Sequence, residues 1–429
     1  MAKPLKVALL GCGVVGCTVA RQLHENADNL AARVGAPLEL VGVAVRDVIK
    51  PRPASGLDIS LFTADAESLV KCADLVVELM GGIDPARSLL LCAIEHGASV
   101  VTANKALLGE DGPQLFEAAD ARGVDLSYEA SVAGAIPLLR LLRESLAGET
   151  VRRVMGIVNG TTNFILDKMD RTGTALPDAL ADAQQCGYTE ADPTADVEGH
   201  DARAKAAILA SIAFHTRVAT SDVHCEGIVN LTVEDICAAR KIDCAIKLLA
   251  ICERTDGGVS VRVHPTLLPR SHPLASVREA FNAVFVETDL AGELMFYGRG
   301  AGAEPTASAV LGDLVQAARH KVNGGHGPGE STYADLPLLG MAQACTSYFI
   351  RLDVQDCPGV LAQVTNVFGA QGVSIESMRQ GVKRSSDGLA MLQLMTHQAT
   401  DAALARTVDQ LWALDDVHAV ASVLRVEGM

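Results

Sequence analysis

Acidic residues crowd the stretch GYTEADPTADVEGHDARAKAAILA, which runs from Gly187 to Ala210. Five carboxylates fall between Glu190 and Asp201, and Lys205 follows Asp201 by four residues in a segment with an apolar helical pattern. This spacing places Asp201 and Lys205 on one helical face, where a simple surface ion pair is one interpretation. The carboxylates would repel one another unless cations lie among them. Because Lys205 and a substrate ammonium could supply those cations, the stretch also fits a site where a lysine gives a proton to a carbonyl.

A second stretch with chemical potential is LLGCGVVG, which contains Gly11, Gly13 and Gly16. It follows a short apolar strand pattern and opens a helical one. The glycines permit a tight turn and close approach of the backbone to a pyrophosphate, whose charge then faces a helix N-terminus. The alternative is a turn that only packs a helix on a sheet. We expect the three glycines, with Val14 and Val15, to contact a dinucleotide.

The kind of dinucleotide depends on the end of the next predicted strand, LELVGVAV, which is followed by Arg46 and Asp47. An arginine at this position can pair with a 2′-phosphate, so NADP(H) is favoured, while Asp47 keeps NAD(H) possible. Lys105 comes at the carboxyl end of a later predicted strand, in VVTANKALL. Ligands of doubly wound sheets collect at that edge, so we expect Lys105 beside the nicotinamide and the substrate.

Three blocks of secondary structure must position these residues, and together they predict an α/β protein. Residues 1–134 alternate strand and helix patterns, which predicts a doubly wound dinucleotide-binding domain. Residues 135–330 mix long helical patterns with strands and predict an α+β domain, whose last helix can return to the first domain. Residues 331–346 are expected to be a linker, and 347–429 show the βαββαβ order of a ferredoxin-like domain. Within the second block, DICAARKIDCAIKLLAICE has helical periodicity and is predicted as helix.

Composition restricts the classes of protein. A chain of 429 residues exceeds what one core usually supports, and a net charge of −16 argues against nucleic acid or an anionic membrane as the main partner. The 11 cysteines include no CxxC pair, and no apolar run reaches the length of a membrane span. We therefore expect a cytoplasmic enzyme with reduced thiols.

Five motifs, in order along the chain, resemble those of homoserine dehydrogenases. They are TANKALL, YEASVAGAIPLL, NGTTNFIL, the acidic stretch quoted above, and YGRGAGAEPTASAVLGDL. Further on, DVQDCPGVLAQV resembles the start of an ACT domain, where the first strand meets its helix. With the glycine-rich turn, the resemblance covers nearly the whole chain, and it implies that residues 135–330 form the substrate-binding, catalytic and dimerisation domain. No segment resembling aspartokinase precedes the nucleotide domain, so the monofunctional form is expected.

The resemblance implies an oxidoreductase that interconverts L-homoserine and L-aspartate 4-semialdehyde with NADP(H) or NAD(H), in threonine, methionine and isoleucine biosynthesis. Lys205 would donate a proton to the aldehyde oxygen, and Lys105 would assist near the cofactor. Glu190 and Asp201 would hold the amino group and reacting end of the substrate, and Asp196 would support them. Positions near the cofactor are matched by Gly187, Glu190, Gly302 and Lys105.

The family also carries a monovalent cation, usually sodium, on main-chain carbonyls and a nearby acid. The matching positions are Glu129, Val132, Gly134 and Ile136. Hard cations prefer oxygen ligands. From the residues alone, SVAGAIP is only a loop that enters a helix.

By resemblance, an ACT domain pairs with a second copy and binds a small amino acid at the loop after its first strand. Here that loop contains Asp356, Gly359, Val360 and Leu361. L-Threonine is the expected effector, and a homodimer or homotetramer is the expected assembly. A purely structural dimerisation module is the alternative.

Two other functions stay open. Another dehydrogenase of an amino-acid-like substrate is one, although the combination of Glu190, Asp201 and Lys205 argues against it. A catalytically silent sensor of nucleotide and amino acid is the other, and it would need neither Lys105 nor Lys205.

Overall fold

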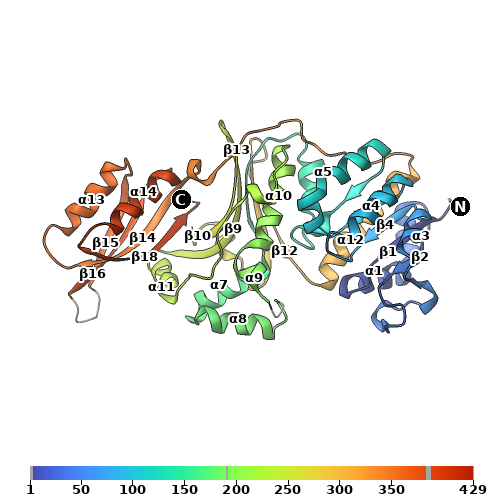
Figure 1. Cartoon of the computed structure of the whole chain (residues 1–429), viewed down its shortest axis with the longest axis horizontal. Helices are drawn as coiled ribbons and strands as arrows, with labels where there is room; N and C mark the ends of the chain where they lie inside the picture. Colours follow the sequence, from blue (N-terminus) through green and yellow to red (C-terminus); the bar gives the residue numbers. More distant parts are fainter. Residues whose placement is uncertain (1–2, 190–191, 383–387, 429) are drawn as a thin grey trace.

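The computed structural model describes residues 3–189, 192–382 and 388–428. An N-terminal part lies at one end of the molecule, a C-terminal part at the other, and a middle part between them (Figure 1). Each part is built around a β-sheet, and the sheets of the middle and C-terminal parts are joined. Among the described residues, no helix combines the length and apolar character needed to cross a membrane.

Six parallel strands form the N-terminal sheet, in the order β3-β2-β1-β4-β5-β6. Both faces are covered, since Val7 and Leu9 of β1 belong to one buried cluster and Ala8 and Leu10 to another. This confirms the predicted doubly wound fold. The strands are β1 (Leu5–Leu10), β2 (Leu38–Ala44), β3 (Phe62–Thr63), β4 (Leu75–Glu78), β5 (Ser99–Thr102) and β6 (Leu126–Ser127); the helices are α1 (Val14–Glu25), α2 (Ala27–Val34), α3 (Ala66–Lys71), α4 (Ala86–Glu95) and α5 (Lys105–Arg122).

One helix of the N-terminal part comes from much later in the chain. Helix α12 (Ala303–Val322) lies against α1 (Figure 1). Its Val310 and Leu314 are fully buried in the same cluster as Val7 and Leu9 of β1. The apolar face of α12 therefore completes one side of the N-terminal sheet.

The middle part has an antiparallel sheet in the order β12-β11-β7-β9-β10, and α10 covers one face of it. Its strands are β7 (Val151–Ile157), β8 (His224–Cys225), β9 (Cys244–Thr255), β10 (Gly258–Pro269), β11 (Phe281–Thr288) and β12 (Glu293–Arg299). Its helices are α6 (Leu138–Arg140), α7 (Gly160–Thr172), α8 (Leu176–Gln185), α9 (Thr194–Val197), α10 (His200–Phe214) and α11 (Val233–Lys241).

The helix predicted over DICAARKIDCAIKLLAICE is only half correct. Helix α11 ends at Lys241, and the remainder is β9, whose residues from Cys244 to Cys252 are all buried. A strand buried on both faces is apolar throughout, so periodicity cannot distinguish it from a buried helix.

The C-terminal part has the predicted βαββαβ order, and its sheet runs β18-β14-β16-β15. β18 also pairs in parallel with β10, with Thr266 opposite Arg425 and Leu267 opposite Val426, so one sheet extends through both parts. The elements are β13 (Leu338–Leu339), β14 (Cys345–Gln355), α13 (Val360–Ala370), β15 (Ile375–Val382), β16 (Leu389–Thr396), β17 (Ala399–Thr400), α14 (Asp401–Trp412) and β18 (Val417–Val426).

Candidate active site

Asp201 lies at the centre of a charged cluster between the N-terminal and middle parts. Lys205, one turn further along α10, donates a hydrogen bond from Nζ to Asp201 Oδ2 at 2.6 Å. Lys105 begins α5 at the carboxyl end of β5, and its Nζ pairs with Asp201 Oδ1. The two lysines are therefore held by opposite oxygens of one carboxylate, and α5 and α10 are in contact (Figure 1).

Local backbone chemistry fixes both lysines. Asn104 caps α5 through its Oδ1, which accepts from Leu107 N at 3.2 Å, while its Nδ2 donates to Gly82 O at 2.6 Å. Gly199 precedes α10 with a φ of +84°, a left-handed conformation that glycine adopts without strain. Lys105 and Asp201 consequently sit at the first turns of two well-anchored helices.

Asn159 connects Asp196, a second predicted site acid, to the cluster. Its Nδ2 donates to Asp196 Oδ1 at 2.6 Å and to Asp201 Oδ2 at 3.0 Å, and its Oδ1 caps α7 by accepting from Thr162 N at 2.8 Å. Thr189 Oγ1 donates to the other oxygen of Asp196 at 2.9 Å. The sequence motif contained Asn159, but its role as a bridge was missed. Glu190 lies outside the described residues.

The charges of the cluster determine what it can do. Burial alone would raise the pKa of Asp201, but the charges and hydrogen bonds of Lys205 and Lys105 hold it well below its ordinary value. Burial lowers the pKa of Lys205, and Asp201 opposes this effect. The Lys205 side chain is 11% exposed and that of Lys105 is 42% exposed. The cluster thus combines a fixed anion, a buried lysine that releases its proton more readily than usual, and a more accessible lysine.

The glycine-rich turn has room for a ligand where the prediction requires it. Gly11 has a φ of +95°, and a Cβ there would lie 2.7 Å from Leu79 O; a Cβ on Gly16 would lie 2.3 Å from Gly11 O. By contrast, no atom lies within 4 Å of a Cβ built on Gly13, which precedes α1 without a side-chain cap. Val14 is 77% exposed at the first turn of α1, and Val15 is half-buried. These residues suit a dinucleotide pyrophosphate on the amides of α1.

The loop after β2 is basic. Arg46 is exposed. Asp47 Oδ1 accepts a hydrogen bond from Ile49 N at 3.0 Å, so this carboxylate stabilises the loop itself. Arg52, which the sequence reasoning did not single out, donates to Asp47 O at 2.9 Å and lies over the Phe62 ring. Arg46 and Arg52 therefore place two positive charges in this loop.

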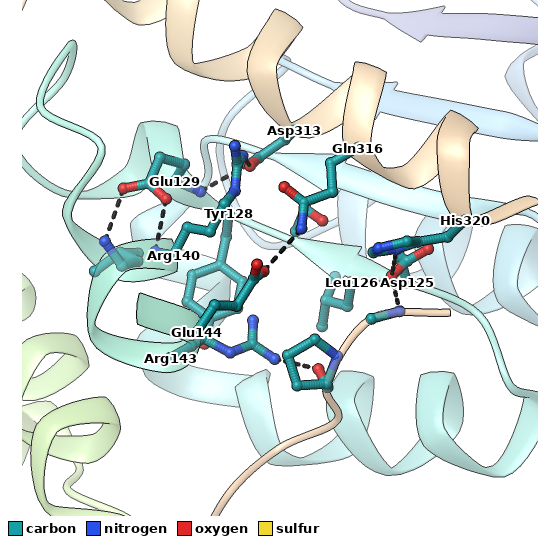
Figure 2. Close-up of a pocket in the computed structure, with 14 residues that line it drawn as sticks. Asp125, Leu126, Tyr128, Glu129, Arg140, Arg143, Glu144, Asp313, Gln316 and His320 are labelled. Atoms are coloured by element: carbon teal, nitrogen blue, oxygen red, sulfur yellow. Dashed lines mark hydrogen bonds and ion pairs between the residues drawn. The ribbon is translucent and has the colours of Figure 1, made fainter. Parts of the chain in front are cut away.

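The proposed cation loop is held by two buried acids (Figure 2). The Glu129 carboxylate accepts from Leu139 N at 2.7 Å and Arg140 N at 2.9 Å, at the start of α6. Asp313 of α12 accepts from Glu129 N at 2.8 Å and from Arg140 Nη2 at 2.5 Å. The Glu129 carboxylate therefore caps the amides of α6 and holds the loop of residues 129–136 in place. Within the described residues, no group of three or more His, Cys, Asp or Glu side chains is arranged around a metal position.

Gly134 shapes the same loop. Its φ is +54°, and a Cβ there would lie 2.4 Å from Gly300 O. Ala135 N also donates to Arg299 O at 3.0 Å. The loop that contains Val132 and Ile136 therefore lies directly against the chain that leads to Gly302, the residue before α12.

Sequence models of protein families match three successive parts of the chain. Residues 11–129 match "Homoserine dehydrogenase, NAD binding domain", residues 137–315 match "Homoserine dehydrogenase", and residues 348–413 match the ACT domain. The homoserine dehydrogenase of Corynebacterium glutamicum is 54% identical over 428 residues, covering 98% of this chain and 95% of the relative. The chain belongs to the homoserine dehydrogenase family.

Solved homoserine dehydrogenases share the architecture. The crystal structure of the enzyme from Thiobacillus denitrificans superposes with a TM-score of 0.93 at 39% identity, covering 99% of this chain and 98% of that one. A hyperthermophilic archaeal homoserine dehydrogenase, solved in complex with NADPH, has a TM-score of 0.63 at 25% identity, covering 76% of this chain and all of its own. The predicted family and fold class are confirmed, and the chain is an oxidoreductase that uses a nicotinamide cofactor.

The ACT domain of this homoserine dehydrogenase has a hollow at the expected regulatory loop. Asp356, Gly359, Val360 and Leu361 line it together with Gln380 of β15. Gly359 precedes α13 with a φ of +101°, and Gln380 Nε2 donates to Asp356 Oδ1 at 3.4 Å. The loop amides at the start of α13 suit a small anionic or zwitterionic ligand.

Proposed function

We propose that this homoserine dehydrogenase interconverts L-homoserine and L-aspartate 4-semialdehyde with NADP(H) favoured over NAD(H). The observation that carries the proposal is the carboxylate of Asp201 between the ammonium groups of Lys205 and Lys105. This cluster lies at the carboxyl end of β5, the edge where a doubly wound sheet binds its ligands. The pathway is the synthesis of threonine, methionine and isoleucine.

In the reducing direction, Lys205 donates a proton to the aldehyde oxygen and Lys105 assists from the more exposed side. Asp201 keeps both lysines in place and, with Glu190, receives the substrate ammonium. Asp196 orients Asn159 and so supports Asp201. A bound nicotinamide supplies or accepts the hydride. In the oxidising direction, neutral Lys205 takes the hydroxyl proton.

The cofactor would be held by Gly11, Gly13, Val14, Val15 and Gly16. The exposed Arg46, with Arg52 in the same loop, supports a 2′-phosphate, and the archaeal relative solved with NADPH supports the same preference. Gly187, Gly302, Glu190 and Lys105 complete the proposed nucleotide site.

Sodium on the carbonyls of Glu129, Val132, Gly134 and Ile136 is also proposed. Asp313 of α12 bonds to Glu129 and Arg140, and the close approach of Gly134 to Gly300 brings the same loop to the chain that leads to Gly302; a cation here would therefore lie beside the proposed cofactor position. L-Threonine at the ACT hollow is the proposed effector, in a homodimer or homotetramer. The proposed domain limits are 1–134, 135–330, 331–346 (linker) and 347–429.

The deciding experiment follows the formation of reduced nicotinamide by the purified chain with L-homoserine. NADP⁺ and NAD⁺ are compared in sodium and in sodium-free buffer, with and without L-threonine. We expect homoserine-dependent turnover, faster with NADP⁺, stimulated by sodium and inhibited by threonine. A folded sample that shows no turnover with either cofactor would instead support the sensor function.

A further inference from the structure

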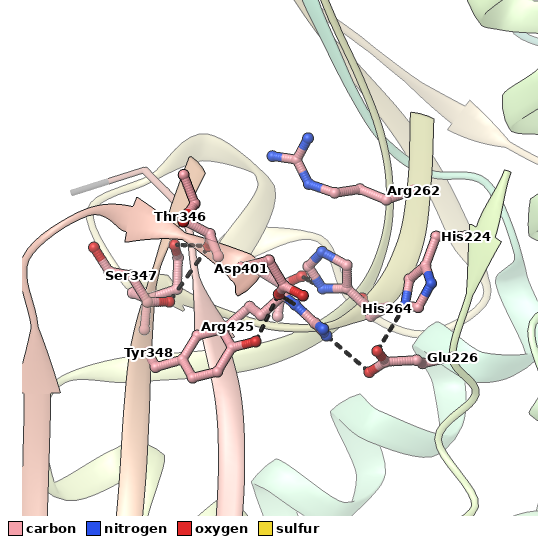
Figure 3. Close-up of polar contacts among 12 residues, drawn as sticks. His224, Glu226, Arg262, His264, Thr346, Ser347, Tyr348, Asp401 and Arg425 are labelled. Carbon is pink, nitrogen blue, oxygen red and sulfur yellow. Dashed lines mark hydrogen bonds and ion pairs between the residues drawn. The ribbon is translucent and has the colours of Figure 1, made fainter. Parts of the chain in front are cut away.

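Arg425 joins the ACT domain to the catalytic domain. It lies on β18 opposite Thr266 of β10, at the point where the two sheets meet. Its Nη1 donates to Glu226 Oε2 of the catalytic domain at 2.8 Å, and its Nε donates to Asp401 Oδ1 of the ACT domain at 2.9 Å (Figure 3). One guanidinium thus holds a carboxylate from each domain.

On the ACT side, Arg425 is tied to two elements. Asp401 begins α14 and also accepts from Tyr348 Oη of β14 at 2.6 Å. The Arg425 guanidinium lies over the Tyr348 ring, 5.6 Å from its centroid. A movement of α14 or β14 would therefore displace Arg425.

On the catalytic side, Glu226 is an anion. Burial raises its pKa, but hydrogen bonds from His224 and Arg425 lower it to about 2. Glu226 follows directly after β8, and its amide donates to Val263 O at 2.8 Å. The segment that starts here contacts the backbone that precedes α10.

Residues 225–228 press against the backbone that leads into α10. A Cβ on Gly227 would lie 2.2 Å from Val197 O, and Ile228 N donates to that same oxygen at 2.8 Å. Cys225 Sγ lies 3.4 Å from Glu198 O. Because Gly227 and Ile228 touch the Val197 backbone directly, we expect a shift of Glu226 to be passed on to that backbone.

The backbone from Val197 to Gly199 links Asp196 of α9 to Asp201 of α10. We propose that the Glu226–Arg425 pair positions this backbone, and that through it the state of the ACT domain sets the affinity of the Asp196/Asp201 cluster for the substrate ammonium. Glu226 and Arg425 act here as positioning residues. The inference rests on the proposed function for the identity of the substrate.

A second ion pair across the same junction provides a matched control. Arg351 of β14 pairs with Asp235 of α11 at 3.2 Å, and both side chains are at least as buried as those of the first pair. Arg240, near the end of α11, bonds Asp170, near the end of α7. Asn159, which belongs to the charged cluster, lies at the opposite end of α7. We therefore expect loss of this pair to weaken the junction but to leave the contacts of residues 225–228 with Val197 and Glu198 in place.

The test compares full-length Arg425→Gln, Arg425→Lys, Glu226→Gln and the double variant with Arg351→Gln. We expect the Arg425 and Glu226 variants to raise KM for homoserine and weaken threonine inhibition about fivefold or more, with the Kd for NADPH unchanged. The double variant should match the singles, and Arg425→Lys should partly restore the wild-type values. If Arg351→Gln gives the same KM and threonine response as Arg425→Gln, the proposal is wrong.

Hydrogen–deuterium exchange of the same proteins separates this inference from the proposed function. Faster exchange over residues 197–205 in Arg425→Gln, but not in Arg351→Gln, is expected even if homoserine is not the substrate. Unchanged exchange in that segment would overturn the positioning role. Absence of homoserine turnover in the wild-type chain would overturn only the proposed function.

Discussion

At the scale of single residues, Lys205 is the group on which the proposed chemistry depends. Lys205→Ala should lower kcat by about 10²- to 10⁴-fold, the usual contribution of a general acid. The Kd for NADPH should stay within about twofold, because Lys205 contacts Asp201 and Val158 rather than the glycine turn. Steady-state kinetics and fluorescence titration measure the two effects. Lys168→Ala, which removes the partly exposed lysine paired with Asp182, is the control. Normal turnover in Lys205→Ala would exclude the mechanism.

The pH dependence of kcat/KM should have opposite signs for homoserine oxidation and for semialdehyde reduction. Homoserine oxidation requires a neutral lysine and should rise with pH, whereas semialdehyde reduction requires a protonated lysine and should fall. Because burial lowers the pKa of Lys205, both changes should be centred below the ordinary lysine value of 10.5. Profiles of kcat/KM against pH provide the measurement. A midpoint at or above 10.5 would contradict this role of Lys205.

The sequence predicted part of this cluster. Asp201 and Lys205 are one helical turn apart, so their pairing follows from local geometry. Lys105 reaches the same carboxylate from a different helix, and Asn159 from the start of a third. Contacts of this kind depend on how helices meet in space, which spacing along the chain does not encode.

At the scale of elements, a substitution in the glycine turn before α1 should weaken cofactor binding without affecting folding. Gly13→Ala should fold normally, because its φ is −79° and no atom lies within 4 Å of a Cβ there. It should still weaken NADPH binding at least about tenfold, since the methyl group would fill space meant for the pyrophosphate. Thermal unfolding and cofactor titration test both statements. Gly148→Ala, at another position with open space, should change neither. Unchanged cofactor affinity in Gly13→Ala would remove the turn from the nucleotide site.

Elements with a strong pattern were predicted well. The parallel strands and the βαββαβ order follow from alternation of strands with helices, and both are confirmed. The error over β9 arose because this strand is central in its sheet, between β7 and β10, and has no polar face to reveal its period.

At the scale of the whole molecule, Glu427 clamps the end of the ACT domain to the catalytic sheet. Its carboxylate pairs with Arg153 of β7 and with Arg262 of β10, whose side chain is fully buried. Glu427→Ala should lower the free energy of unfolding by about 3 kcal/mol, because two buried cations lose a partner. Urea unfolding gives the value. Asp289→Asn, which breaks an exposed pair with Arg152, should change it by less than about 1 kcal/mol. Equal changes in the free energy of unfolding in the two variants would show that the ion pairs of Glu427 do not stabilise the protein.

The junction itself was not foreseeable from the sequence. The pairing of β10 with β18 joins segments far apart in the chain through only two residue pairs. The charges that accompany it, Glu226, Arg425 and Glu427, look in sequence like ordinary surface residues. Only the assembled sheet shows that they form ion pairs across the junction between the domains.

The late arrival of α12 constrains how this chain can be made. During synthesis the six strands β1–β6 and the five helices α1–α5 leave the ribosome long before Ala303 does, and domains usually fold in that order. Here the early sheet exposes an apolar flank, around Val7 and Leu9, until Val310 and Leu314 have been translated. The nascent protein should therefore need a holding chaperone, or a slow final docking step, before its nucleotide half is complete. For the same reason, a fragment that ends near residue 134 lacks α12. It should therefore be unsuitable for exchange between enzymes to change their cofactor.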